Sequence, residues 1–299
     1  MKKILLASFI VLLFTNSVIP DPNSKSNSIM SKSSVSYMYE QGIDQLPHVV
    51  FWRKIMNLHQ DSCIINIHAE RKILTTMHYP TWYAYQGEQK AKILDSFRRM
   101  HNLIDSPRIV GTPGKSFFYL FEKVAPKVPL GMQEFEKNNV DPWYAKAILL
   151  IESPNQLQKS PAGAYGAFQL MPYVARQYGL KVNKSIDERA NFERSAYAAS
   201  QLIKTICIPY AKQMLTDFGV QEIDEDELWF KLFVMHVYNA GAGNVRTALF
   251  TISEPLSGMP LIYKLWNTNA GRFQSSSQNY SQLILAAFVE YDQRIESKS

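Results

Sequence analysis

The sequence predicts a mainly α fold. Apolar residues recur at helical spacing in four stretches of the second half of the chain, and few stretches show the period of two that half-buried strands require. Apolar residues make up 46% of the 299 residues, so a sizeable core can be buried. We expect a helical accessory region over residues 37–128 and a larger, mainly α domain over residues 129–299.

The first residues have the layout of a secretory signal peptide. Lys2 and Lys3 precede an apolar run over residues 4–14, which is too short to span a bilayer comfortably, and small polar residues follow it. We therefore expect residues 1–20 to be a signal peptide and the protein to be exported to the periplasm or cell envelope. An uncleaved anchor is the alternative. Residues 21–36 are rich in Ser, Asn and Lys and are expected to form a disordered leader.

Charge and cysteine content leave several kinds of partner and redox state open. The chain has 32 basic and 26 acidic residues, a formal charge of +6, which suits an anionic partner but is also ordinary for solubility. Cys63 and Cys207 could pair after export, or they could be two buried thiols. Neither paired cysteines at zinc-site spacing nor an H-E-x-x-H motif occurs, so we expect no metal and no cofactor.

The accessory region has a globular composition over residues 49–103, with plausible but imperfect helical spacing. Its aromatic cluster is more often part of a core than a surface that stacks sugars; its members are Tyr79, Trp82, Tyr83 and Tyr85. The sequence GTPG over residues 111–114 is a turn signal. We place the boundary of the region between this turn and Pro129.

Helix signals are clearest after Pro129. Asp141 and Pro142 are an N-cap and a first-turn proline for a helix over residues 141–153, and Pro154 ends it. Three further helices are expected, over residues 192–208 with Pro209 as the stop, over residues 228–238 before a run of small residues, and over residues 280–295.

Glu152 has an unusual position for an acidic residue. It follows the apolar residues 149–151 in the last turn of its helix, where the backbone dipole is negative. The dipole contributes only about 0.3–1 kcal/mol, so desolvation would have to dominate any raised pKa. A carboxylic acid that is protonated near neutral pH can donate its proton to a leaving oxygen. The alternative is a glutamate at a helix end that points into water.

Two breaks made of small residues follow apolar helices. Residues 160–166 carry glycine and alanine, which let the backbone approach a ligand closely, and Gln169 adds a hydrogen-bond donor and an acceptor. The second break places small residues beside the hydroxyl of Tyr238 and the amide of Asn239. A pocket built in this way suits a sugar that carries N-acetyl groups.

Together these motifs resemble a known family. Four motifs are similar, in order and separation, to those of the lytic transglycosylases of the soluble-lytic-transglycosylase, goose-lysozyme-like superfamily: ES at residues 152–153, SPAGAYGAFQLMP at 160–172, YNAGAGNV at 238–245 and a looser SSSQNY at 275–280. The stretch YGLKVNKSIDER at residues 178–189 resembles the branch that includes membrane-bound lytic murein transglycosylase D. The resemblance covers residues 140–291, about half of the chain.

The resemblance implies a lysozyme-like catalytic domain that cleaves the β-1,4 bond between N-acetylmuramic acid and N-acetylglucosamine in peptidoglycan. Glu152 would act first as the general acid and then as the base on the C6 hydroxyl of the muramoyl residue, which closes a 1,6-anhydro ring. The substrate-binding positions implied by the motifs are Ser153, Gln169, Tyr238, Asn239 and Tyr280, with Tyr280 near the acid. Glycan strands of peptidoglycan would be the partner, without nucleic acid. Peripheral association with the envelope, or with a secretion or conjugation apparatus, would be compatible with this role.

Two other functions remain open from the sequence. A non-catalytic envelope protein could keep a lysozyme-like fold to bind glycan or to act as a scaffold. A hydrolytic lysozyme would result if a second acid reached the cleft, and Asp187, Glu188 and Glu193 are the acids that follow the loop. The chain also departs from the family pattern directly after Glu152, where Pro154 and Asn155 replace an aromatic residue and the stretch to Ser160 is one residue shorter.

Overall fold

The computed structural model describes residues 35–104, 107–152 and 159–296. The predicted signal peptide, residues 21–34 of the predicted leader, and Ser153 lie outside the described residues. The last two leader residues begin helix α2. Within the described parts, no helix combines the length and the apolar character needed to cross a membrane.

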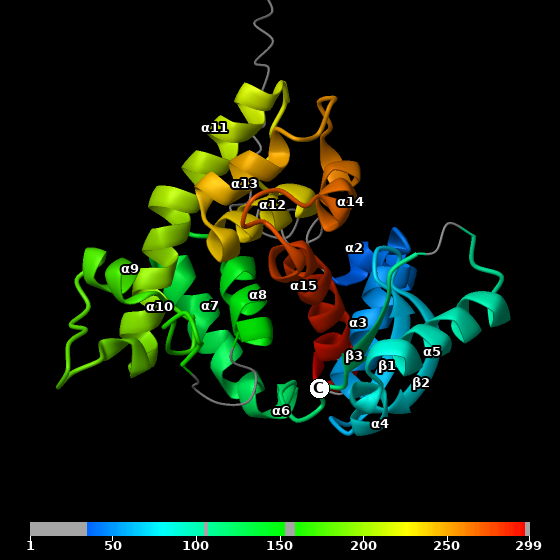
Figure 1. Cartoon of the computed structure of the whole chain (residues 1–299). Coiled ribbons are helices and arrows are strands. Elements are labelled where there is room, and N and C mark those ends of the chain that lie inside the picture. Colours follow the sequence, from blue (N-terminus) through cyan, green and yellow to red (C-terminus); the bar gives the residue numbers. More distant parts are fainter. Residues whose placement is uncertain (1–34, 105–106, 153–158, 297–299) are drawn as a thin grey trace, which may run out of the picture.

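Most of the fold is helical (Figure 1), which confirms the mainly α prediction. The α-helices are α2 (Val35–Glu40), α3 (Pro47–Asn57), α4 (Tyr79–Ala84), α5 (Gly87–Met100), α6 (Phe121–Val124), α7 (Val128–Lys137), α8 (Pro142–Glu152), α9 (Pro172–Gln177), α10 (Phe192–Leu202), α11 (Ile208–Phe218), α12 (Leu228–Ala240), α13 (Ala242–Leu249), α14 (Gly258–Asn267) and α15 (Ser275–Arg294). The strands are β1 (Ser62–Ile67), β2 (Lys72–His78) and β3 (Ile109–Pro113).

Pro209 does not end a helix, which is a correction to the prediction. Helix α10 passes through a π-helical turn over Ile203–Cys207 and continues as α11. Pro209 therefore stands in the first turn of α11, directly after the π-helical turn, and the helix continues past it. The last predicted helix, α15, also starts five residues earlier than expected, at Ser275.

The accessory region is helical only in part. Strand β1 pairs antiparallel with both β2 and β3, in the order β2-β1-β3. All residues of β1 except the first are buried, so the strand has no alternation of apolar and polar residues that sequence analysis could detect. The first residues of GTPG lie in β3 rather than in a turn. A side chain at Gly111 would collide with the indole of Trp82, which explains the glycine there.

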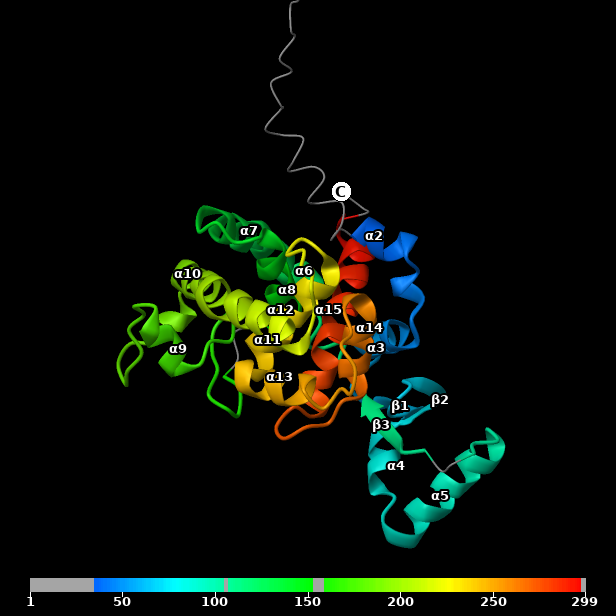
Figure 2. The ribbon, with the colours of Figure 1, turned by 90° about the horizontal axis from the view of Figure 1, so that it is seen from above.

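Two hydrophobic cores are present among the described residues. The smaller one lies between the sheet, α4 and α5, at one corner of the molecule in Figure 2, and contains Cys63, Ile65, Trp82, Phe97 and Ile109. Trp82 is therefore a core residue, as predicted for the aromatic cluster, while Tyr83 is 69% exposed. The boundary at residue 128 stays a prediction, but α3 packs into the larger core together with α8, α12 and α15.

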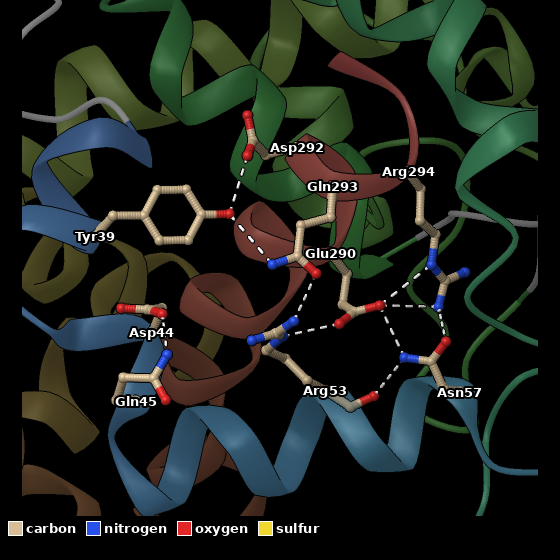
Figure 3. A network of polar contacts seen from close by, with 9 residues as sticks. All are labelled: Tyr39, Asp44, Gln45, Arg53, Asn57, Glu290, Asp292, Gln293 and Arg294. Atoms are coloured by element: carbon tan, nitrogen blue, oxygen red, sulfur yellow. Dashed lines mark hydrogen bonds and ion pairs between the residues drawn. The ribbon is translucent and has the colours of Figure 1, made fainter. Parts of the chain in front are cut away.

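A polar network joins α3 to the end of α15 (Figure 3). The carboxylate of Glu290 accepts hydrogen bonds from Arg53 Nε at 2.8 Å, from Asn57 Nδ2 at 2.8 Å and from Arg294 Nη2 at 3.0 Å. On α2, the hydroxyl of Tyr39 donates to Asp292 at 3.0 Å. Helices from the two ends of the described chain are thus held together by an ion pair and hydrogen bonds as well as by apolar packing.

Candidate active site

Glu152 is the last residue of α8 and faces α15. The residues that precede it on α8 are buried in the large core, and the Glu152 side chain is itself partly buried. Its Oε1 accepts a hydrogen bond of 2.7 Å from the hydroxyl of Tyr280, a buried residue of α15. The interpretation of Glu152 as a solvated helix-end glutamate is therefore wrong.

Two opposing effects act on this carboxyl group. Burial raises the pKa of Glu152, and the hydrogen bond from Tyr280, which favours the ionised form, lowers the pKa by a smaller amount. The net shift is upward, with desolvation as the main cause, as the sequence indicated. Among the described residues, none of the groups that shift this pKa is a second carboxylate.

Three tyrosines share the electrostatic environment of Glu152. Burial raises the pKa values of Tyr119, Tyr238 and Tyr280, and the negative charge of Glu152 raises them further. All three hydroxyls thus stay protonated and can act only as neutral hydrogen-bonding groups. Tyr119 was missed by the sequence analysis, because it lies before residue 140. The only signal was a lone hydroxyl in the apolar run of residues 117–121.

Tyr238 ties the end of α12 to the small-residue loop. Its hydroxyl donates to the backbone carbonyl of Phe168 at 2.5 Å, next to Gln169. Gln169 has a φ of 45°, in the left-handed region, and its side-chain amide donates to the carbonyl of Gly166 at 3.0 Å. The loop therefore has a defined and locally strained backbone.

Arg189 holds the small-residue loop in place through hydrogen bonds to its backbone. This residue was not selected from the sequence. Its buried guanidinium donates to the carbonyls of Gly163 and Leu170, both at 2.8 Å, and pairs with Asp187 at 2.7 Å. The backbone of Arg189 also packs against Gly166, where an added Cβ would lie 2.0 Å from the Arg189 carbonyl oxygen. Gly166, with a φ of 89°, is therefore required both by its conformation and by this close approach.

A pocket of about 330 Å³ opens beside the loop, between α9, α10 and the end of α12. Gln169, Tyr238 and the exposed amide of Asn239 line it, together with small residues that follow α12. Glu152 and Tyr280 do not line this pocket. Tyr238 does line it and also belongs to the three tyrosines around Glu152, so it connects the pocket with the acid. A larger pocket of about 390 Å³ lies at the other end of α12, beside Glu227 and Trp229, away from these residues.

Two of the three acids that follow the loop have other partners. Asp187 is paired with Arg189, which lowers the pKa of Asp187. Glu188 accepts a hydrogen bond of 2.6 Å from the backbone N–H of Lys181, and Glu193 is exposed. Among the residues that the structure describes, the groups that interact with Glu152 are tyrosine hydroxyls, which suits chemistry run by one carboxyl group.

A comparison with models of protein families finds a match for the middle of the chain. Residues 132–252 match the family model of the transglycosylase SLT domain. The match supports the lytic transglycosylase superfamily and indicates peptidoglycan-cleaving activity of that general type. The SLT match includes Glu152, Gln169, Tyr238 and Asn239, but neither Tyr119 nor Tyr280. No curated protein matches the chain.

Proposed function

We propose that the protein is a lytic transglycosylase that cleaves the β-1,4 bond between N-acetylmuramic acid and N-acetylglucosamine and leaves a 1,6-anhydro end. The observation that carries the proposal is the contact between Glu152 and Tyr280. A partly buried carboxyl group with a raised pKa accepts a hydrogen bond of 2.7 Å from a neutral hydroxyl, within an SLT domain. A general acid needs such an environment to keep its proton near neutral pH.

In the proposed reaction, protonated Glu152 first gives its proton to the glycosidic oxygen while the bond from that oxygen to C1 of the muramoyl residue breaks. The resulting carboxylate then accepts the proton of the muramoyl C6 hydroxyl, and the C6 oxygen bonds to C1. The acid is thereby restored and no water is consumed. The hydroxyl of Tyr280 stabilises the carboxylate between the two steps, when the negative charge is present.

The other site residues are proposed to position the glycan. The amides of Gln169 and Asn239 offer both donors and acceptors to the acetamide groups and hydroxyls of the sugars. Tyr238 supports Gln169 through its bond to Phe168. Ser153, which follows Glu152, keeps its role from the family resemblance as a proposed sugar contact.

The finer assignments are also proposals. The stretch at residues 178–189 supports the branch of membrane-bound lytic murein transglycosylase D, and the layout of residues 1–20 supports export to the periplasm or cell envelope. Glycan strands of peptidoglycan are the proposed partner. Association with the envelope, or with a secretion or conjugation apparatus, would then be peripheral.

The decisive experiment is mass spectrometry of the soluble products released from purified peptidoglycan. We expect 1,6-anhydro muropeptides from the wild-type protein and none from Glu152→Gln. Glu193→Gln is a matched control, since it removes an exposed carboxylate of the same domain, and should release the same products at the wild-type rate. Products heavier by one water would show a lysozyme instead. The absence of soluble products from the wild-type protein would favour a glycan-binding scaffold.

A further inference from the structure

A second polar pocket, of about 180 Å³, lies where the turn between β1 and β2 meets the start of α15. It is lined by basic, amide and hydroxyl side chains around one indole, and none of its residues is acidic. The lining residues are His68, Ala69, Arg71, Arg108, Trp266, Asn267, Asn269, Ser275, Gln278 and Gln282. Neither the SLT match nor the proposed cleavage site accounts for this pocket, since its residues lie before residue 132 or after residue 252.

Arg71 carries a buried charge that has only neutral partners. The residue is 5% exposed, and its Nη2 donates to Asn279 Oδ1 at 2.7 Å, while Nη1 lies 3.5 Å from Asn66 Oδ1. Its guanidinium also lies over the rings of Phe51 and Trp52, at 5.1 and 5.2 Å from their centroids. A buried charge is costly without a countercharge, and an anion in the pocket would supply one.

Arg108 adds a second positive charge at the same pocket. It is exposed at the pocket edge, and its charge, together with the larger effect of burial, lowers the pKa of Arg71 to about 10. Over the described residues, neither guanidinium lies within ion-pair distance of a carboxylate. Burial and the two arginines lower the pKa of His68 to about 4, so His68 is neutral at pH 7. The described lining of the pocket thus has two cations and no anion.

The remaining lining groups favour a peptide over a bare inorganic anion. Phosphate offers mainly acceptors, so donors alone would suffice to bind it. Here the exposed residues Asn267 and Asn269 bring amide groups that both donate and accept, as the backbone next to a peptide carboxylate requires. Trp266 provides an apolar wall for a side chain.

The pocket and Glu152 lie on opposite faces of α15. Gln278 and Gln282 line the pocket, and Tyr280, which contacts Glu152, is two residues from each. Because successive helical residues are rotated by about 100°, Tyr280 points about 200° away from either glutamine. A ligand in this pocket would therefore not occupy the cleavage site.

We propose that Arg71 and Arg108 form a binding site for the terminal carboxylate of a peptide. The ligand assignment rests on the proposed function, because the glycan strands of peptidoglycan carry short peptides that end in carboxylates. The site would hold a peptide of the wall while another part of the polymer enters the cleft beside Glu152.

Calorimetric titration of the full chain with two tripeptides tests the proposal. One tripeptide ends in a free carboxylate and the other, of the same sequence, ends in an amide. We expect the carboxylate form to bind at least tenfold more tightly, the effect of one charge-assisted hydrogen bond. Arg108→Gln, at an exposed position that should not disturb folding, should weaken its binding about tenfold. Arg99→Gln removes an exposed arginine of α5 outside the pocket and should leave binding unchanged.

Competition with phosphate and the Glu152→Gln variant distinguish failure of the peptide site from failure of the cleavage proposal. Equal affinity for both tripeptides, or no effect of Arg108→Gln, would overturn the site. Inorganic phosphate that displaces the peptide with an equal or lower Kd would overturn its assignment to peptides. Glu152→Gln should bind the tripeptide as the wild-type protein does. Peptide binding without release of muropeptides by the wild-type protein would refute the cleavage proposal and leave the carboxylate site intact.

Discussion

At the scale of single residues, Glu152 is controlled by two environments that oppose each other. Burial at the end of α8 favours the protonated acid, and the hydroxyl of Tyr280 favours the carboxylate. A group that must give a proton and then take one back benefits from both, because neither form is strongly excluded. The first effect could be predicted from the apolar residues before Glu152. The position of Tyr280 near the acid was implied only by the family resemblance, because Tyr280 lies on a helix more than a hundred residues later.

Tyr280→Phe should separate these two effects. Loss of the hydroxyl removes the bond that favours the carboxylate, so the pKa of Glu152 should rise further. The alkaline limb of the pH–rate profile should then move to higher pH, because activity is lost as the acid ionises. We also expect a loss of activity of roughly tenfold or more, from a hydrogen bond to a charged group worth about 1.5–3 kcal/mol. An unchanged alkaline limb would argue against a functional contact between the two residues.

Glu152→Gln should also change stability, with a dependence on pH. The folded-state pKa of Glu152 is raised, so its protonated form is favoured in the folded protein, and this stabilisation is lost as the pH rises through the folded pKa. Urea unfolding should therefore show Glu152→Gln to be more stable than the wild-type protein at pH 8. The difference should disappear at pH 4, below the pKa of about 4.3 that a glutamate has in the unfolded chain. A constant difference at both pH values would contradict the buried position of Glu152.

At the scale of elements, sequence patterns predicted helices well where their ends carry specific residues. Asp141 and Pro142 start α8 as expected, and the backbone N–H of Trp143 donates to Asp141 Oδ1 at 2.8 Å. The sheet was not foreseen, because β1 is buried along almost its whole length and its apolar run has no period. The continuation of α10 into α11 was not foreseen either, since a π-helical turn leaves no clear signal in a sequence.

The start of α8 also depends on a buried ion pair. Lys231 of α12, only 1% exposed, pairs with Asp141. The carboxylate that caps α8 therefore also neutralises the buried charge of Lys231 on α12. Asp141→Asn keeps a good capping residue but removes the charge. We expect it to lower the free energy of unfolding by about 3 kcal/mol, the low end of the range for a broken buried pair. Glu225→Gln, which breaks the exposed pair with Lys212, should cost at most about 1 kcal/mol. Equal losses in chemical denaturation would contradict this account.

At the scale of the whole molecule, the two hydrophobic cores keep the two cysteines apart as buried free thiols. Cys63 lies in the smaller core and is buried, while Cys207 lies in the larger one, and both are free thiols. Of the two alternatives that the sequence left open, the structure supports the buried thiols. Burial raises the pKa of each thiol, which keeps both in the unreactive protonated form.

Labelling of the thiols should therefore report on the two cores separately. We expect neither cysteine to react with a thiol reagent under native conditions. In increasing urea, Cys63 should react before Cys207, because the smaller core buries less apolar surface and should open at a lower free energy. Peptide mapping of the labelled protein distinguishes the two sites. Simultaneous labelling would show that both cores unfold together.

The candidate site is likewise a property of the whole chain. The motifs and the family resemblance selected Glu152, Ser153, Gln169, Tyr238, Asn239 and Tyr280, and all of these except Tyr280 lie within the SLT match. Tyr119 and Tyr280 come from either side of that match, and only the packing of α15 against α8 and α12 brings Tyr280 to the acid. Contacts between segments so far apart leave no local pattern, so the tyrosine surroundings of Glu152 could be predicted only in part.

Helix α15 also sets the moment at which the site can form. It packs against α3, near the start of the described chain, and it carries the hydroxyl that donates to Glu152. Because a chain is synthesised from its first residue onward, residues 275–294 are the last of these elements to be released. The pairing of α3 with α15 spans more than two hundred residues and must wait for them. A partly synthesised chain therefore has Glu152 without its partner, and the candidate site is completed only after the last helix of the described chain has been made.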